Sequence, residues 1–171
     1  MPSLLFQRSQ DATIIVVVLA ESTVGVVAQD ESGPEPLVAV TGTVGCQQVT
    51  DGLSELDENG VEHFRGYATR CTLTMGDERL DDPYIFTLNT DCYADGGCTQ
   101  WGTTETEGPD GWRGTYRGWS RGGGYPALVG VAKGFGAYEG LTYVYGYDSS
   151  GTVDGVIYEG PPPPWDVAVP E

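Results

Sequence analysis

The stretch KGFGAYEGLTYVYGYD, from Lys133 to Asp148, is rich in both glycine and tyrosine and is the clearest indication of the fold in this sequence. Glycine weakens helices and strands, whereas the tyrosines, threonine and valine of the stretch are typical of strands. The large residues of its second part share one face of the predicted strand: Leu141, Tyr143, Tyr145 and Tyr147. In a strongly curved sheet, glycines occupy corners and close approaches of neighbouring backbones. The stretch therefore favours a closed, curved sheet over a flat one.

The chain from Leu37 onward shows the same character, since strand-like segments alternate with turn signals and no window has sustained helical periodicity. The predicted strands lie within LVAVTGTVGC, HFRGYATRCTLTM, YIFTLNTDCY, CTQWGTTETE, GWRGTYRGWSR, PALVGVAKGFG, LTYVYGYD and TVDGVIYEG. We therefore predict an all-β domain over residues 37–160, a closed antiparallel β-barrel of about eight strands. Closure also removes the edges on which a tyrosine-rich strand aggregates.

Two of these strands flank GPDG, residues 108–111, which suits a type I turn with a glycine bulge. The predicted cross-strand partners are Gly108 with Trp112, Glu107 with Arg113, Thr103 with Arg117 and Trp101 with Trp119. Trp112 and Tyr116 lie on the other face of this hairpin. Because both faces carry aromatic residues, the alternation does not tell which face is the interior.

The charge of the chain excludes some classes of partner. Its 171 residues carry a formal net charge of −17, with eight lysines and arginines in total. Nucleic acid phosphates and anionic membrane surfaces both select clusters of basic residues, so neither is an expected partner. The length suffices for one domain with its own core.

The N-terminal region predicts export. Residues 12–20, ATIIVVVLA, form a short apolar run, and Val26 and Ala28 suit signal-peptidase cleavage. We therefore predict that residues 1–28 are a signal segment and that the mature protein is secreted or extracytoplasmic. The alternative is that the run is a first, β-branched strand of the domain. It is too short to span a membrane, so no membrane span is predicted in the mature chain.

Two further segments flank the predicted domain. The acidic, proline-broken residues 29–36 are predicted to be a linker. The proline-rich residues 161–171 are predicted to be an extended tail.

The cysteines support an exported protein. The chain has four of them: Cys46, Cys71, Cys92 and Cys98. An even number in a short exported chain favours two disulfides, for which three pairings exist. Cys92 and Cys98 enclose the flexible turn YADGG, which favours the pairs Cys92–Cys98 and Cys46–Cys71. The alternative is zinc, but zinc sites use close C-x-x-C pairs or histidines, and the chain has one histidine.

GFGAYEGL at residues 134–141, followed by a strand, a turn and GVIYEG, resembles the G-x-G-x-Y-x-G-L signature of the allene oxide cyclase-like barrels. That group includes plant allene oxide cyclases, dirigent proteins and the barrel cyclases of spirotetronate biosynthesis. The matching residues are Gly134, Gly136, Tyr138, Gly140 and Leu141. The resemblance covers roughly the C-terminal half of the chain. It implies a small eight-stranded barrel, lipocalin-like in shape, with a ligand cavity in its lumen, but it places no catalytic residue on this sequence.

The aromatic residues are the main candidates for a binding site. One face of the two C-terminal hairpins is predicted to line the lumen and bind a ligand through Trp112, Tyr116, Tyr143, Tyr145 and Tyr147. The alternative is that these side chains simply fill the core, because an eight-stranded barrel either is packed or holds one small ligand.

Charged residues supply weaker candidates. Arg113, Arg117 and Arg121 share one strand face and form a candidate anion anchor, although a solvated outer face paired with Glu105 and Glu107 is favoured. His63 has no recognisable catalytic partner in the sequence and is predicted to have no special role.

No metal site or cofactor is predicted. The acidic oxygens of DGLSELDENGVE, residues 51–62, suggest a calcium loop, but Gly66 stands where the terminal glutamate of an EF-hand belongs. Leading among the predicted functions is non-catalytic binding of a small apolar or aromatic molecule in the lumen. The alternatives are a cofactor-free cyclase or isomerase acting there, and a structural or assembly protein with a filled barrel.

Overall fold

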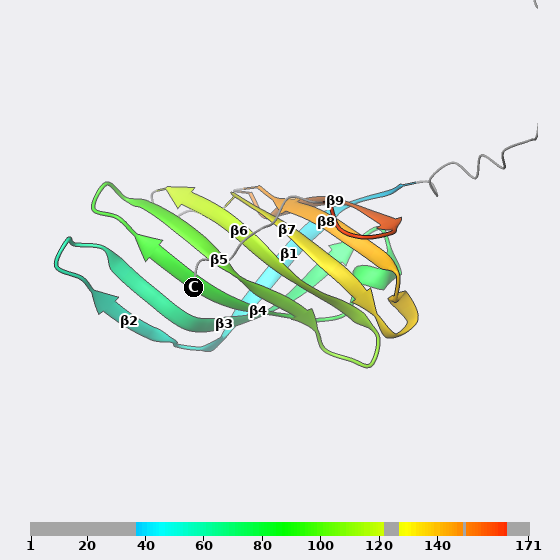
Figure 1. Ribbon diagram of the computed structural model, residues 1–171, viewed down its shortest axis with the longest axis horizontal. Helices are drawn as coiled ribbons and strands as arrows, with labels where there is room; N and C mark the ends of the chain where they lie inside the picture. The colour runs from blue at the N-terminus through cyan, green and yellow to red at the C-terminus, as the bar shows by residue number, and fades with distance from the viewer. Residues whose placement is uncertain (1–36, 122–126, 149, 164–171) are drawn as a thin grey trace, which may run out of the picture. The chain divides into compact units, whose positions relative to one another are not determined.

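The computed structural model describes residues 37–121, 127–148 and 150–163. These residues form one antiparallel sheet of nine strands (Figure 1). The strands are β1 (Val38–Thr50), β2 (Leu53–Leu56), β3 (Glu62–Met75), β4 (Tyr84–Cys92), β5 (Gly97–Thr106), β6 (Gly111–Arg121), β7 (Ala127–Phe135), β8 (Leu141–Tyr147) and β9 (Thr152–Glu159). Two short 3-10 helices, η1 (Glu78–Leu80) and η2 (Gly136–Tyr138), precede β4 and β8. The predicted all-β class is therefore confirmed.

The sheet closes into a ring because β3 pairs with two segments in succession. Residues 62–65 of β3 pair with β2, and residues 68–75 pair with β1. The other side of β1 pairs with β9, and β9 to β4 follow one another back to β3. Because β1 and β2 share one position beside β3, the nine strands occupy eight positions, in agreement with the predicted number of about eight.

Both cysteine pairs join residues that lie directly opposite each other on neighbouring strands. Cys46 of β1 is bonded to Cys71 of β3, and Cys92 of β4 is bonded to Cys98 of β5. The Cα atoms are 4.1 Å apart in each pair. The structure thus has the two predicted pairings, and the first of them staples the two strands that close the ring.

The predicted register of the β5–β6 hairpin is wrong by two residues. The observed partners are Glu105 with Arg113, Trp101 with Arg117 and Thr99 with Trp119. The turn is wider than predicted because the Thr106 side chain takes part in it: the backbone N–H of Trp112 donates to Thr106 Oγ1 at 2.8 Å. The N–H of Glu107 donates instead to the carbonyl of Pro83, in the loop before β4. A shift of two residues leaves the faces of the strands unchanged.

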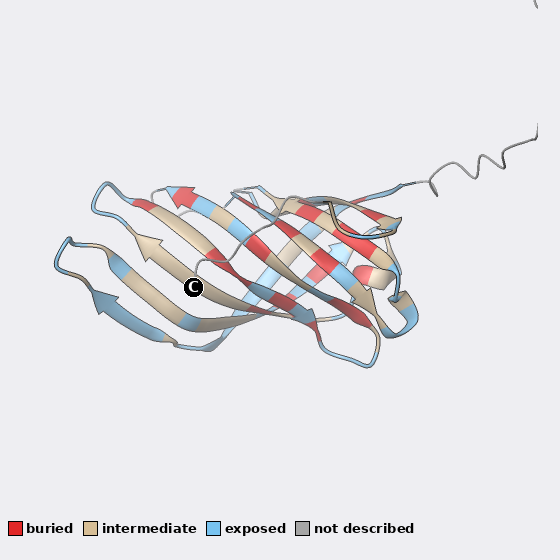
Figure 2. Ribbon diagram, viewed as in Figure 1, coloured by how far each residue is buried: buried red, intermediate tan, exposed pale blue. Residues whose placement is uncertain are grey.

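One face of each strand forms the interior of the ring, and Figure 2 shows buried and exposed residues alternating along β6 and β7. On β6 the buried residues include Trp112, Tyr116 and Ser120, and the exposed ones are Arg113, Arg117, Trp119 and Arg121. Tyr143 and Tyr145 of β8 are also buried. The interior is therefore the aromatic face without the arginines, a choice that the alternation left open.

Trp101 is an exception, because it points outward and is nevertheless buried. The guanidinium of Arg65, from β3, lies 4.9 Å from the centre of its ring. This cation–π contact covers the indole on the outer surface of the sheet.

Side chains close one end of the ring. Leu80 of η1 is fully buried, and the indole Nε1 of Trp112 donates to the carbonyl of Arg79 at 2.8 Å. Tyr138 of η2 stacks on Trp112 with 5.6 Å between ring centres. The loops that carry η1 and η2 thus hold a plug over this end, and the turns at the other end leave room for a cavity.

Several predicted segments lie outside the described residues: the signal segment 1–28, the linker 29–36 and residues 164–171 of the tail. Among the residues that the structure describes, no helix is long and apolar enough to cross a membrane.

Candidate functional site

An apolar cavity of about 170 Å³ lies inside the ring, near the β8–β9 turn and away from η1. Its lining comes from seven strands and this turn: Val44, Cys46, Thr69, Cys71, Phe86, Leu88, Gln100, Tyr116, Leu128, Tyr147, Asp148 and Gly151. Trp112, Tyr143 and Tyr138 fill the plugged end, whereas Phe86, Tyr116 and Tyr147 share the lining of the cavity with smaller residues.

The five predicted lumen residues divide between these two regions. All of them project into the ring, but only Tyr116 and Tyr147 line the cavity. Trp112, Tyr143 and Tyr145 pack against one another in the plugged half, with 5.7 Å and 5.0 Å between the centres of successive rings. They form the aromatic floor beneath the cavity.

The sequence prediction missed the other lining residues, of which the aliphatic ones are Val44, Leu88 and Leu128. The only signal for them is their position on the inward face of their strands. Gln100 carries a similar signal, because it stands on the inward face of β5 between Cys98 and Gly102.

Gln100 presents an unpaired acceptor to the cavity. Its side-chain oxygen Oε1 is enclosed and accepts no hydrogen bond from the residues that the structure describes. A buried acceptor without a partner costs about 1–3 kcal/mol, so this atom favours an occupant that can donate a hydrogen bond.

Asp148 places a negative charge at the rim of the cavity. Its Oδ1 accepts hydrogen bonds from the hydroxyl and backbone N–H of Ser150, at 2.6 and 2.8 Å, and from the backbone N–H of Thr152, at 3.0 Å. The hydrogen bond from the Ser150 hydroxyl, and then the two backbone donors, hold the pKa of Asp148 below its ordinary value. The carboxylate is therefore ionised at neutral pH and engaged in holding the β8–β9 turn.

The tyrosines that face the interior are neutral phenols. Burial raises the pKa of Tyr116, Tyr145 and Tyr147 above the ordinary value for a phenol. The Tyr116 hydroxyl donates to the carbonyl of Thr87 at 3.3 Å, which it reaches across Gly102. The two tyrosines of the cavity thus contribute apolar ring surface and no charge.

The three arginines of the candidate anion anchor lie on the outer face of β6, away from the cavity. Arg113 pairs with Glu105, while Glu107 pairs with Arg70 of β3 at 2.6 Å between Oε2 and Nε. This arrangement agrees with the favoured interpretation of a solvated outer face, although Glu107 has a different partner from the one predicted.

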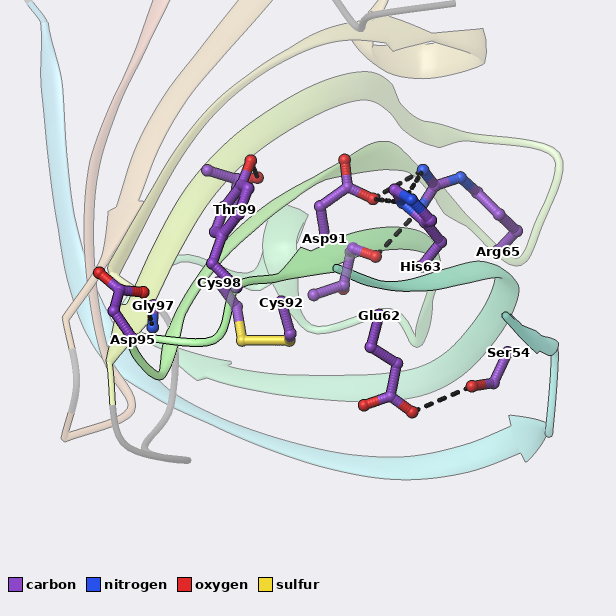
Figure 3. Close-up of a disulfide and its surroundings, with 12 residues drawn as sticks. Ser54, Glu62, His63, Arg65, Asp91, Cys92, Asp95, Gly97, Cys98 and Thr99 are labelled. Atoms are coloured by element: carbon purple, nitrogen blue, oxygen red, sulfur yellow. Dashed lines mark hydrogen bonds and ion pairs between the residues drawn. A yellow bond between two sulfur atoms is a disulfide. The ribbon is translucent and has the colours of Figure 1, made fainter. Parts of the chain in front are cut away.

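His63 lies in a charged cluster that the sequence did not reveal. Its Nδ1 is 2.6 Å from Asp91 Oδ1, and Arg65 donates to the same oxygen at 2.7 Å (Figure 3). Its Nε2 is 3.5 Å from Asp57 Oδ2. The hydrogen bond with Asp91 raises the pKa of His63, although its partial loss of solvation opposes the shift. His63 and Asp91 come together because the register of β3 with β4 puts them opposite each other. A prediction of that register would have found this cluster.

This cluster binds strands together and shows no arrangement for nucleophilic catalysis. Ser54 of the neighbouring strand β2 donates its hydroxyl hydrogen to Glu62 and not to His63 (Figure 3). Asp57 accepts the backbone N–H of Val61 and so holds the β2–β3 turn. Within residues 37–121, 127–148 and 150–163, no group of three or more His, Cys, Asp or Glu side chains could hold a metal ion.

Comparisons with protein-family models, with curated proteins and with solved structures found no match to this chain. The resemblance to the allene oxide cyclase-like barrels therefore stays a prediction from the GFGAYEGL motif.

Proposed function

We propose that the protein binds a small apolar or aromatic molecule in the cavity inside the ring and does not transform it. The observation that supports this function most directly is the partly open cavity of about 170 Å³ with its apolar lining. An apolar cavity of about 150 Å³ in a protein core is large enough to bind benzene. A ligand with a single aromatic ring therefore matches the size and chemistry of this cavity.

The proposal also covers the type of barrel to which the ring belongs. We propose that the ring is an allene oxide cyclase-like barrel, and its eight strand positions and lumen cavity support this assignment. The positive φ angles of Gly136 and Gly140, at 63° and 91°, support the structural role of the glycine motif. We also place the working protein outside the cytoplasm, a proposal that its two disulfides support.

A cyclase or isomerase acting in the same cavity has less support. Among the described lining residues the only ionisable ones are Asp148, which its turn engages, and two tyrosines whose raised pKa keeps them protonated. General acid–base catalysis needs a group whose pKa lies near the working pH. A purely structural role also has less support, since the side chains leave the cavity unfilled.

Toluene provides a direct test of the binding function. Burying one aromatic ring removes about 200 Å² of surface from water, worth about 5 kcal/mol, or a dissociation constant of roughly 0.1–1 mM. Methyl NMR of labelled protein should show saturable shifts at Val44, Leu88 and Leu128, which line the cavity. The methyl groups of Leu53, which is 78% exposed, should not shift.

Two variants of adjacent residues on β7 control for the site of binding. Leu128→Trp places an indole in the cavity and should weaken toluene binding at least tenfold. Val129→Trp places the same side chain on the outer face, where Val129 is 49% exposed, and should leave binding unchanged. Absence of saturable shifts in the unmodified protein in buffer nearly saturated with toluene, at a few millimolar and above the expected dissociation constant, would contradict the proposed function.

A further inference from the structure

The position of Gln100 separates it from the other polar residues of the interior. It lies opposite Thr90 of β4 and Gly118 of β6, and Gly118 presents no side chain beside it. Gln100 lines the cavity with an enclosed oxygen that has no donor among the described residues. Thr104 lies four residues after Gln100 on the same face of β5. Its side-chain oxygen is also unpaired, but it does not line the cavity.

A ligand can complete the hydrogen bonding of Gln100. A water molecule enclosed in a protein needs two to four polar partners, and the lining around Gln100 is mainly aliphatic and aromatic. A hydroxyl or N–H group attached to an apolar ring needs only one acceptor and gains its remaining stabilisation from the lining. A site built with such an acceptor discriminates strongly against analogues that lack the donor.

The charge at the rim restricts the ligand further. Asp148 is ionised at neutral pH and is the one charged side chain among the described lining residues. An anionic ligand would give up its hydration to enter an apolar lining that offers it no cation, and it would meet this exposed carboxylate at the rim.

We infer that the ligand is a neutral molecule with one hydrogen-bond donor on a single apolar ring, such as a phenol or a benzylic alcohol, and that Gln100 Oε1 accepts this bond. The inference names the ligand class of the proposed binding function and rests on it.

The test compares phenol with toluene, which have nearly the same size and shape. In a cavity without an acceptor, phenol binds at least about tenfold more weakly than toluene, because its hydroxyl loses its hydrogen bonds to water. The structure instead predicts that phenol binds the unmodified protein at least as tightly as toluene. The measurement is the ratio of the two dissociation constants from methyl NMR titrations.

Gln100→Leu removes the acceptor and replaces the amide side chain with an apolar one of similar size. The expected result is a loss of phenol binding relative to toluene of about tenfold or more. Thr104→Val is the matched control, because it removes another unpaired oxygen from the same face of the same strand and should leave the ratio unchanged. The ratio in the unmodified protein does not depend on whether either variant folds.

Two more compounds test the remaining parts of the inference. Pyridine accepts a hydrogen bond but donates none, so it should bind at least tenfold more weakly than phenol. Benzoate should bind at least tenfold more weakly than benzyl alcohol, because its charge loses hydration in the apolar lining and finds Asp148 instead of a cation. Pyridine binding as tightly as phenol would overturn the assignment of Gln100 as the acceptor, and tight benzoate binding would overturn the restriction to neutral ligands.

The outcomes separate this inference from the proposed function. If toluene binds and phenol binds tenfold more weakly, with the same ratio in Gln100→Leu, the cavity binds apolar rings and only the inference fails. If neither compound binds, the proposed function fails and the inference fails with it.

Discussion

Gly136 is the residue at which the fold most clearly requires glycine. Its φ of 63° lies in the left-handed region, where a side chain costs about 1–2 kcal/mol. An added Cβ would also lie 2.6 Å from the carbonyl oxygen of Pro109, in the facing loop. Gly140, with a φ of 91°, has the same conformational requirement but open space around the missing Cβ.

We therefore expect Gly136→Ala to destabilise the protein by more than about 2 kcal/mol and Gly140→Ala by about 1 kcal/mol. The two values differ because only Gly136 adds a steric clash to the backbone strain. Urea denaturation measures both free energies of unfolding. Gly45→Ala is the control, since Gly45 has open space and no positive φ, and it should cause no loss of stability. Equal values for Gly136→Ala and Gly45→Ala would show that the glycine is incidental.

At the scale of the elements, the two disulfides constrain different lengths of chain. Cys46–Cys71 spans a sequence separation of 25 and joins the strands that close the ring, whereas Cys92–Cys98 spans 6 and staples one hairpin. In the chain-entropy description, a longer closed loop restricts the unfolded chain more. The bond that closes the ring should therefore contribute more to stability than the bond across the hairpin.

The expected losses are about 3.5 kcal/mol for the double variant Cys46→Ala/Cys71→Ala and about 2 kcal/mol for Cys92→Ala/Cys98→Ala. Urea denaturation of the two double variants beside the unmodified protein measures this difference. Thiol counting on the unmodified protein checks that both bonds are present. A larger loss from the hairpin pair would contradict the ordering, and four free thiols in protein from its native compartment would contradict both bonds.

At the scale of the whole molecule, the interior carries an unusual number of phenols. Five of the described tyrosines project into the ring: Tyr84, Tyr116, Tyr143, Tyr145 and Tyr147. Burial is the largest cause of the raised pKa in each of them. In the unfolded chain the same side chains ionise near pH 10. Because folding then favours the protonated form, the stability present at lower pH is lost as the pH rises above about 10.

An alkaline titration tests this prediction through the absorbance of phenolate. At about pH 11 the folded protein should show roughly five fewer ionised tyrosines than the chain unfolded in urea, where all are free to ionise. The free energy of unfolding should fall steadily between about pH 10 and the pH at which the protein unfolds. Ionisation of every tyrosine near pH 10, with the circular dichroism of the sheet unchanged, would contradict a closed aromatic interior.

The features that could be predicted from the sequence are those that depend on local pattern. Alternation with a period of two and frequent turn residues predict strands wherever they occur, so the all-β class followed from the sequence. The YADGG turn favoured a bond between Cys92 and Cys98, and hence one between Cys46 and Cys71, over the two other possible connectivities. The shared face of Tyr143, Tyr145 and Tyr147 followed from their spacing, because side chains alternate across a strand.

Contacts between distant segments decided the rest. The β5–β6 register depended on Thr106 Oγ1 and on Pro83 in another loop, and turn statistics for GPDG contain neither. The assembly of the strands determines which face of each strand is the interior. It also brings His63 opposite Asp91. The cavity beside Gln100 is a volume that side chains from seven strands leave unfilled. Such a volume has no local signature, because packing is a property of all the surrounding side chains together.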